Sequence, residues 1–267
     1  MKYAVLGYNT INIGDDIQSF VASTLVDVSY IVMRDDYEKV YDFSGRRCNL
    51  EEPIKLIMNG WFMHNPDWKT GNDQIKFPIH NSLITPVFVS TCLSKDVPNL
   101  YSASCLDFYK TFGPVLCRDS ATLRKLEAEG VAAEFFGCLT QLLEVESVPV
   151  NPAHQKKYSE STIYIDCPKA FRKRRWGQKT FSFQHYSKDL ASLNPRERIR
   201  RAGDRLSAYR YAKKIYTGRL HAFLPCRAMG LDVEYVGDLN YRVQDLVNVS
   251  PQKSRLRERF LERLLVT

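Results

Sequence analysis

The sequence predicts an α/β fold built from two Rossmann-like halves that face each other across a central cleft. Apolar runs alternate with helical patterns along most of the 267 residues, which is typical of α/β units. Each run is rich in Ile, Val and Leu on both alternations, as expected for parallel strands covered on both faces. The pattern breaks into Pro, polar and charged residues at 146–160 and then restarts. We therefore expect an N-terminal domain at 1–148 and a C-terminal domain at 149–267, joined by a linker.

The first half begins with a strand, a glycine-containing loop and a helix. The apolar run 2–8 ends in NTINIGDD, and the helical pattern IQSFVASTLVDV follows. Asp15 or Asp16 is suited to cap this helix. Further strands are predicted at 29–36, 54–62 and 82–92.

The block that starts at Gly113 repeats this pattern. GPVLC predicts a strand, and the helix after it has Asp119 or Ser120 as its cap and Gly130 as its stop. A short strand should follow. In the second half, strands are predicted at 161–168, 181–187, 213–218 and 231–237, and helices at 196–212, 219–230 and 254–264.

Composition indicates an ordinary globular protein, with 44% hydrophobic and 25% charged residues. No apolar run approaches the roughly 20 residues that span a bilayer, and the N-terminus does not have the pattern of a signal peptide. We therefore expect a cytoplasmic protein. The seven cysteines form no CxxC pair, so we expect reduced, mostly buried thiols and no zinc or thiol-exchange site. No cluster of metal ligands is evident.

The net charge of +8 is concentrated late in the chain, at 171–179, 195–201 and 254–264. Such asymmetry suits nucleic acid, anionic lipid or a phosphorylated substrate, although solvated helix faces look the same. No RNA- or DNA-binding module is recognisable, so we expect no nucleic-acid partner. Contact with the inner face of a membrane stays open, and nothing in the residues sets an oligomeric state. The last run carries the stripe Leu256, Phe260 and Leu264, which predicts an amphipathic closing helix.

Four loops at predicted strand ends carry polar groups. NIGDD lacks the spacing of either nucleotide-binding motif, and NGWF contains Asn59, which also fits a simple turn before an aromatic core. In GPVLCRDS, an arginine comes just before a helix cap. In TGRLHA, an arginine and a histidine occupy the first turn of a helix. The candidate residues are Asn12, Asp15, Asp16, Asn59, Arg118, Asp119, Arg219, Leu220 and His221.

The two arginines predict an anion site. A helix N-terminus offers unpaired N–H groups and partial positive charge, and a guanidinium adds a planar fork for carboxylate or phosphate. If Arg118 and Arg219 converge from the two halves, the cleft suits a small dianion or trianion. His221 alone would fit a structural histidine, but a cation beside it at a positive helix end favours a bound anion. Pro225 cannot donate to the His221 carbonyl, so the first turn should be irregular.

Together the four loops resemble the polysaccharide pyruvyltransferase family. The early NIGDD, the NGWF, the block GPVLCRDSATLRKLEAEGVAAEFFGCLT and TGRLHAFLPCRAMG appear in the family's order between about residue 5 and about residue 245. The resemblance implies a GT-B-like fold. It also implies transfer of the pyruvyl group of phosphoenolpyruvate, a co-substrate, onto two hydroxyls of one sugar, with release of phosphate and without a metal or redox cofactor. Such an enzyme would serve exopolysaccharide or capsule biosynthesis.

The resemblance also implies roles for particular residues. Arg118 matches the arginine that holds phosphoenolpyruvate, and Arg219, Leu220 and His221 match the RLH segment that contacts it. His221 then becomes the expected acid catalyst, because C3 of the enol must gain a proton. A histidine with a pKa near 6.5 can donate one at neutral pH.

The acceptor does not follow from the resemblance. A saccharide linked to a nucleotide or a lipid is open, and the run 171–179 fits either its diphosphate or a solvated loop. Asn12, Asp15, Asp16, Asn59 and Asp119 are candidates for acceptor binding or for a base, with helix caps and turns as the other reading. The alternative function is a GT-B-type glycosyltransferase that uses a nucleotide sugar.

Overall fold

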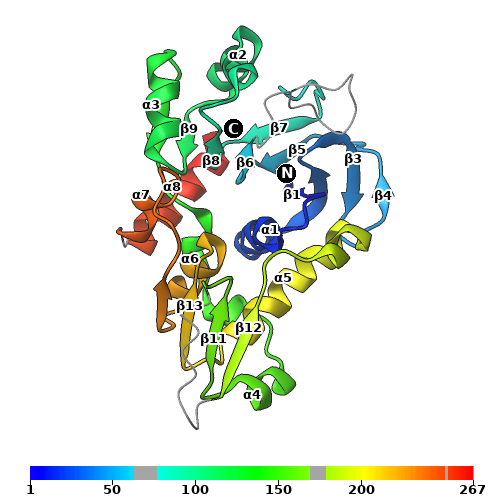
Figure 1. Cartoon of the computed structure of the whole chain (residues 1–267). Coiled ribbons are helices and arrows are strands. Elements are labelled where there is room, and N and C mark those ends of the chain that lie inside the picture. Colours follow the sequence, from blue (N-terminus) through cyan, green and yellow to red (C-terminus); the bar gives the residue numbers. More distant parts are fainter. Residues whose placement is uncertain (63–76, 169–178, 250–251, 267) are drawn as a thin grey trace.

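The computed structural model describes residues 1–62, 77–168, 179–249 and 252–266 (Figure 1). Most of the basic run 171–179 lies outside these residues. Within them the chain is a mixed α/β protein, which confirms the α/β class of the prediction. No helix of the described part combines the length and apolar character needed to cross a bilayer.

A six-stranded sheet opens the molecule, in the order β4-β3-β2-β1-β5-β7. Four of its strands are β1 (Lys2–Gly7), β2 (Val28–Met33), β5 (Ile54–Ile57) and β7 (Ile84–Val87), and adjacent strands among these four pair in parallel. Every residue of β5 is buried. An antiparallel hairpin of β3 (Asp36–Asp42) and β4 (Arg47–Cys48) extends one edge. Sequence analysis did not predict this hairpin, because its strands carry charged residues on the exposed side.

A second parallel sheet, of order β10-β9-β8-β6, continues the first. Only Phe88 separates β7 from β8 (Val89–Leu93), so one run of chain serves both sheets. The other strands are β6 (Trp61–Phe62), β9 (Val115–Cys117) and β10 (Ala133–Phe135). The predicted strand 54–62 is therefore two short strands in different sheets. The helices of this half are α1 (Ile13–Leu25), α2 (Ala103–Phe112), which was not predicted, and α3 (Ser120–Ala128).

The third sheet is wholly parallel, in the order β12-β11-β13-β14. Its strands are β11 (Thr162–Ile165), β12 (Thr180–Phe183), β13 (Lys214–Thr217) and β14 (Val233–Tyr235), all near their predicted places. The accompanying helices are α4 (Pro152–Tyr158), α5 (Pro195–Tyr209), α6 (Leu220–Ala228), α7 (Gln244–Val247) and α8 (Lys253–Val266). The expected linker at 146–160 thus contains a short helix, capped by Asn151.

One apolar core joins the elements on both sides of residue 148. It includes Ile17 of α1 and Ile199 of α5, and these two helices pack along each other. Helix α8 carries its buried stripe of Leu256, Phe260 and Leu264 into the same core, as predicted. Although it follows the third sheet in sequence, α8 lies along the first half.

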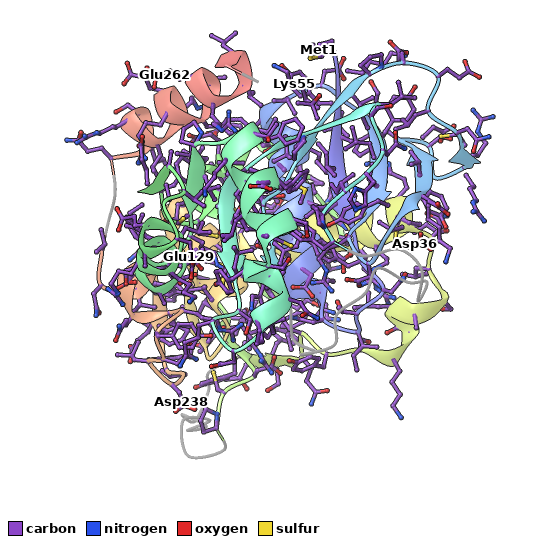
Figure 2. The ribbon with its side chains drawn as sticks, turned by 90° about the horizontal axis from the view of Figure 1, so that it is seen from above. Met1, Asp36, Lys55, Glu129, Asp238 and Glu262 are labelled. Atoms are coloured by element: carbon purple, nitrogen blue, oxygen red, sulfur yellow. The ribbon has the colours of Figure 1, made fainter. Side chains whose placement is uncertain are left out.

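Several contacts tie α8 to that half. Arg259 bonds Glu134, the Arg263 side chain donates to the Phe112 carbonyl, and Lys55 of β5 donates to the Leu264 carbonyl. Figure 2 shows α8, with Glu262, along the same upper edge of the molecule as Lys55. Arginines of the third basic run therefore make intramolecular contacts.

Two strand orders decide where a ligand can sit. In the first sheet β1 lies between β2 and β5, and in the third sheet β11 lies between β12 and β13. Successive connections therefore leave opposite sides of β1 and of β11. Such reversals open a crevice at the carboxyl ends of the strands.

Candidate functional site

Loops from both halves of the chain line one cavity of about 190 Å³. The residues before position 148 come from the start of α1, from β6 and from the end of β9. Those after it come from the ends of β12, β13 and β14. The lining residues are Asn12, Gly14, Asp15, Trp61, Arg118, His185, Tyr186, Gly218, Arg219, Leu220, His221, Tyr235, Asn240, Arg242 and Val243. The structure brings Arg118, Arg219 and His221 to one cavity.

The first turn of α6 presents open backbone donors to this cavity. Arg219 is the N-cap and makes no side-chain cap bond, and the N–H groups of Leu220 and His221 have no acceptor among the described residues. Gly218 makes the close turn before it, since a Cβ there would lie 2.9 Å from the Asp166 carbonyl oxygen. These features form a helix N-terminus able to receive an anion.

Arg118 reaches the cavity from the loop between β9 and α3. The residue is 2% exposed, and its Nη1 donates to Gln18 Oε1 at 3.3 Å. Nε is covered and has no partner, and no carboxylate of the described chain forms an ion pair with this guanidinium. A buried cation in this state is costly unless an anion joins it.

Two more guanidinium groups border the cavity. Arg219 Nε donates to Asp166 Oδ2 at 2.6 Å and its guanidinium lies 4.5 Å from the Tyr186 ring centroid. Arg242 lies 4.0 Å from a Trp61 ring centroid. We call Arg118, Arg219, Arg242 and the first turn of α6 the cationic wall. Against these cations, the lining residues include one carboxylate, that of Asp15.

His221 stands in the cationic wall with its Nε2 covered and without a partner among the described residues. Burial lowers its pKa well below the usual value, and the charges of Arg118 and Arg242 lower it further. By itself the protein therefore holds His221 neutral at pH 7. This differs from the expectation of a pKa near 6.5, and it makes protonation of His221 depend on a bound anion.

A second group of lining residues consists of Asn12, Asp15 and His185, which we call the polar wall. Asn12 is the N-cap of α1, because its Oδ1 accepts from the Gly14 N–H at 3.0 Å. The prediction that Asp15 or Asp16 caps this helix is wrong, since both lie inside its first turn. Asp15 faces the cavity, and its Oδ2 accepts from Thr10 Oγ1 at 2.7 Å.

Three other candidates do not line the cavity. Asp16 is 1% exposed, and both of its oxygens accept from Arg198 of α5 at 2.9 Å. Asn59, also buried, donates to the Gln18 carbonyl at 3.0 Å. Asp119 is the N-cap of α3 and accepts from the Thr122 N–H at 2.9 Å, the helix-cap role that sequence analysis left open. These side chains stabilise the fold, so the prediction that Asp16, Asn59 and Asp119 bind the acceptor is not supported by their positions.

The start of α3 also differs from the expectation of a second open helix end. Asp119 takes the Thr122 N–H, and Asp245 takes the Ser120 N–H at 3.0 Å. The start of α1 is similarly filled, because Ile13 N–H donates to the His185 carbonyl. The contribution of the β9–α3 loop is thus the Arg118 side chain alone.

Sequence analysis missed several lining residues, above all His185 and Arg242. Each follows the last residue of a parallel strand by a few positions, His185 after β12 and Arg242 after β14. Strand-end position was the signal that could have identified them. The seven cysteines are free and all but Cys48 are buried, as predicted, and no group of three or more metal-ligating side chains occurs in the described part of the chain.

Comparison with known proteins gives information about the fold only. No known protein family and no curated protein matches the chain. Among solved structures, it is similar to a functionally uncharacterized protein of Klebsiella pneumoniae subsp. pneumoniae NTUH-K2044. The TM-score is 0.51 and the identity 14%, over 92% of this chain and 87% of that one.

Proposed function

We propose that this protein is a pyruvyltransferase that moves the pyruvyl group of phosphoenolpyruvate onto two hydroxyls of a saccharide, within a GT-B-like pair of Rossmann-like halves. One observation carries the proposal. The buried Arg118, which forms no ion pair in the described chain, and the open first turn of α6 line one cavity, and His221 of that turn has no partner for its Nε2 among the described residues. This is a site for a compact anion with a proton-transfer group beside it.

Phosphoenolpyruvate fits the cationic wall by its charge. Its C2 carries both a carboxylate and a phosphate ester, and both groups need several donors. Arg118 supplies a fork, Arg219 and Arg242 supply further positive charge, and Leu220 and His221 supply N–H groups. This arrangement also stabilises the phosphate as it leaves.

The reaction consumes one proton, at C3 of the enol, and releases two, one from each sugar hydroxyl. C3 of the enol gains a proton and becomes a methyl group, and the first sugar hydroxyl bonds to C2 and loses its proton. The C2–O bond to phosphate then breaks, and the second hydroxyl bonds to C2 and loses its proton. One released proton balances the proton taken by C3, and the other leaves with phosphate. The products are a cyclic ketal and inorganic phosphate.

His221 is the proposed donor of the C3 proton. Burial and the charges of Arg118 and Arg242 hold its pKa low, so it becomes an acid when the substrate's negative charge favours the imidazolium. Asp15, the carboxylate that lines the cavity, is the proposed acceptor of a hydroxyl proton. Asn12 lies beside it for acceptor binding. The saccharide, linked to a nucleotide or a lipid, would be met in the cytoplasm at the inner face of the membrane.

The test is an incubation with phosphoenolpyruvate and a panel of UDP-sugars and oligosaccharides. Two results are expected together: release of phosphate, and an increase in the mass of the sugar by one pyruvic acid less one water. Absence of both, with folded protein and a broad panel, would contradict the proposal.

A thermal-shift comparison separates the alternative, a glycosyltransferase that uses a nucleotide sugar. A ligand at 100 times its dissociation constant stabilises by about 2.7 kcal/mol. Phosphoenolpyruvate should raise the melting temperature, and UDP or GDP should not. Stabilisation by the nucleotides alone would favour the glycosyltransferase.

A further inference from the structure

His185 is a buried histidine of the polar wall that sequence analysis did not single out. It follows β12, is 0% exposed and lines the cavity. Its backbone N–H donates to Asp166 Oδ2 at 3.1 Å, and its carbonyl accepts from the Ile13 N–H at 2.9 Å. The backbone at His185 is therefore fixed between the β11 loop and the start of α1.

Helix α5 determines which ring nitrogen of His185 carries the hydrogen. Tyr209 is buried, and its hydroxyl has His185 Nε2, at 3.2 Å, as its one hydrogen-bond partner among the described residues. A buried O–H without an acceptor is costly, so the Tyr209 hydroxyl donates to Nε2. With Nε2 accepting, the neutral imidazole of His185 carries its hydrogen on Nδ1.

The surroundings keep this ring neutral. Burial lowers the pKa of His185 to about 3, Asp166 opposes this effect, and Arg205 and Arg219 add to it. At neutral pH the side chain therefore offers one N–H donor and no positive charge.

That donor has no partner in the described chain. A Cβ at Gly14 would lie 3.4 Å from His185 Nδ1 and 3.1 Å from Asn12 Oδ1, so glycine leaves this side of the cavity open. Asp15 is the next residue on the same turn. The polar wall thus places an N–H donor and a carboxylate acceptor near each other, whereas the cationic wall offers donors and positive charge. A sugar hydroxyl both accepts and donates, so the polar wall suits a hydroxyl better than an anion.

We propose that His185 is a positioning residue that donates its Nδ1–H to a hydroxyl oxygen of the acceptor sugar, and that Tyr209 holds it in the required tautomer. The hydroxyl's own hydrogen is directed to Asp15. The acceptor role rests on the proposed function, whereas the tautomer does not.

The tautomer is tested first, by two-bond ¹H–¹⁵N correlation spectra of histidine-labelled protein. The chain has five histidines, and His185→Asn assigns the signal. We expect a neutral ring with its hydrogen on Nδ1 from pH 6 to 8, and a shift toward the Nε2–H form in Tyr209→Phe. An Nε2–H ring or an imidazolium in the wild-type protein would overturn the proposal, whatever the enzyme's activity.

The ligand is tested on the same spectra with phosphoenolpyruvate alone and then with methyl glycosides of galactose, mannose and glucose added. Phosphoenolpyruvate alone should move His221 strongly and His185 weakly, and a bound glycoside should move His185 Nδ1. A His185 response to phosphoenolpyruvate as large as that of His221 would overturn the hydroxyl assignment, as would no response to any glycoside that the protein turns over. If phosphoenolpyruvate moves neither ring, the proposed function fails while the tautomer result stands.

Kinetics of two variants complete the test. The side-chain amide introduced by His185→Asn retains an N–H near the position of Nδ1, whereas His185→Leu removes it. Because a neutral hydrogen bond corresponds to roughly a tenfold change in affinity, the acceptor KM should rise about tenfold in the leucine variant and much less in the asparagine variant. The dissociation constant of phosphoenolpyruvate should stay unchanged in both. Equal acceptor KM values for wild type, asparagine and folded leucine variant would contradict the proposal. If the leucine variant does not fold, Tyr209→Phe replaces it.

Discussion

The two walls of the cavity differ in how their polar groups are satisfied. In the cationic wall, Arg118 Nε, His221 Nε2 and the first N–H groups of α6 have no partner in the described chain. In the polar wall, Asn12 and Asp15 each accept a hydrogen bond from a neighbour. His185 is bonded through its backbone and through Nε2, which leaves Nδ1 as the one covered side-chain atom of this wall without a partner. Unsatisfied buried groups destabilise a fold. Because most of them lie in the cationic wall, we infer that a ligand, and not the fold, sets the requirement there.

The comparison separates two kinds of task. The cationic wall is suited to hold and discharge an anion, because its donors are already oriented before the ligand arrives. The polar wall is suited to orient a neutral group, because its donors and acceptors balance. Each variant below removes one group from one wall, so a mixed outcome would show that the division is wrong.

The largest effect is expected at the proton donor. His221→Asn removes the proton transfer to C3 but leaves the cationic wall's charges, so turnover should fall by about 10²–10⁴-fold. Stabilisation by phosphoenolpyruvate should remain, since the arginines and the α6 N–H groups are retained. Phosphate release and thermal shift measure the two properties. A variant with wild-type turnover would remove His221 from the chemistry.

Loss of Arg118 should come next. Arg118→Ala removes a buried donor to the anion, so turnover should fall about 10²–10³-fold and the thermal shift with phosphoenolpyruvate should shrink. Arg118→Lys should not restore either property, because an ammonium lacks the planar fork. The melting temperature should hold or rise, since the guanidinium has no ion pair to lose.

Arg201→Ala is the matched control for charge. Arg201 pairs with Asp189 on the surface of the same protein, and such pairs contribute little to stability. Its removal should leave turnover and melting temperature nearly unchanged. A similar loss of activity in this variant would mean that overall charge, and not the position of Arg118, governs binding.

Neighbouring acids on α1 provide the sharpest contrast between site and scaffold. Asp15→Asn should keep its stability and lose about 100-fold in turnover, because an amide accepts no proton. Asp16→Ala leaves Arg198 buried without its carboxylate, so the free energy of unfolding should fall by about 3–5 kcal/mol. Urea unfolding and phosphate release separate the two. Loss of stability in Asp15→Asn, with activity kept in a folded Asp16→Ala, would reverse the assignment.

This contrast also shows what sequence could and could not predict. Most strands, the helices around the site and the place of Arg118, Arg219 and His221 at the cavity follow from apolar periodicity and from position at strand ends. The difference between Asp15 and Asp16 does not, because it depends on α5 bringing Arg198 against one face of α1. A long-range contact of this kind cannot be recognised from the residues of NIGDD alone.

The same reason explains two other misses. The open helix end at α6 and the filled one at α3 look alike in sequence, but Asp245, 125 residues away, closes the second. His185 becomes a candidate only when α5 supplies Tyr209 and α1 supplies Gly14 around it. In each case the deciding partner lies in a distant segment.

The smallest expected effect is a linkage between binding and pH. In the free protein burial and the charges of Arg118 and Arg242 hold the pKa of His221 low, and a bound anion should raise it. Binding of phosphoenolpyruvate should therefore take up a fraction of a proton, and affinity should weaken as pH rises through the pKa of the complex, by at most about tenfold per pH unit. Titration calorimetry at pH 7.5 in two buffers of different ionisation enthalpy measures this uptake, above the phosphate's own pKa of about 6. His221→Asn should abolish it. Uptake that persists in this variant would show that the proton is taken up by a group other than His221.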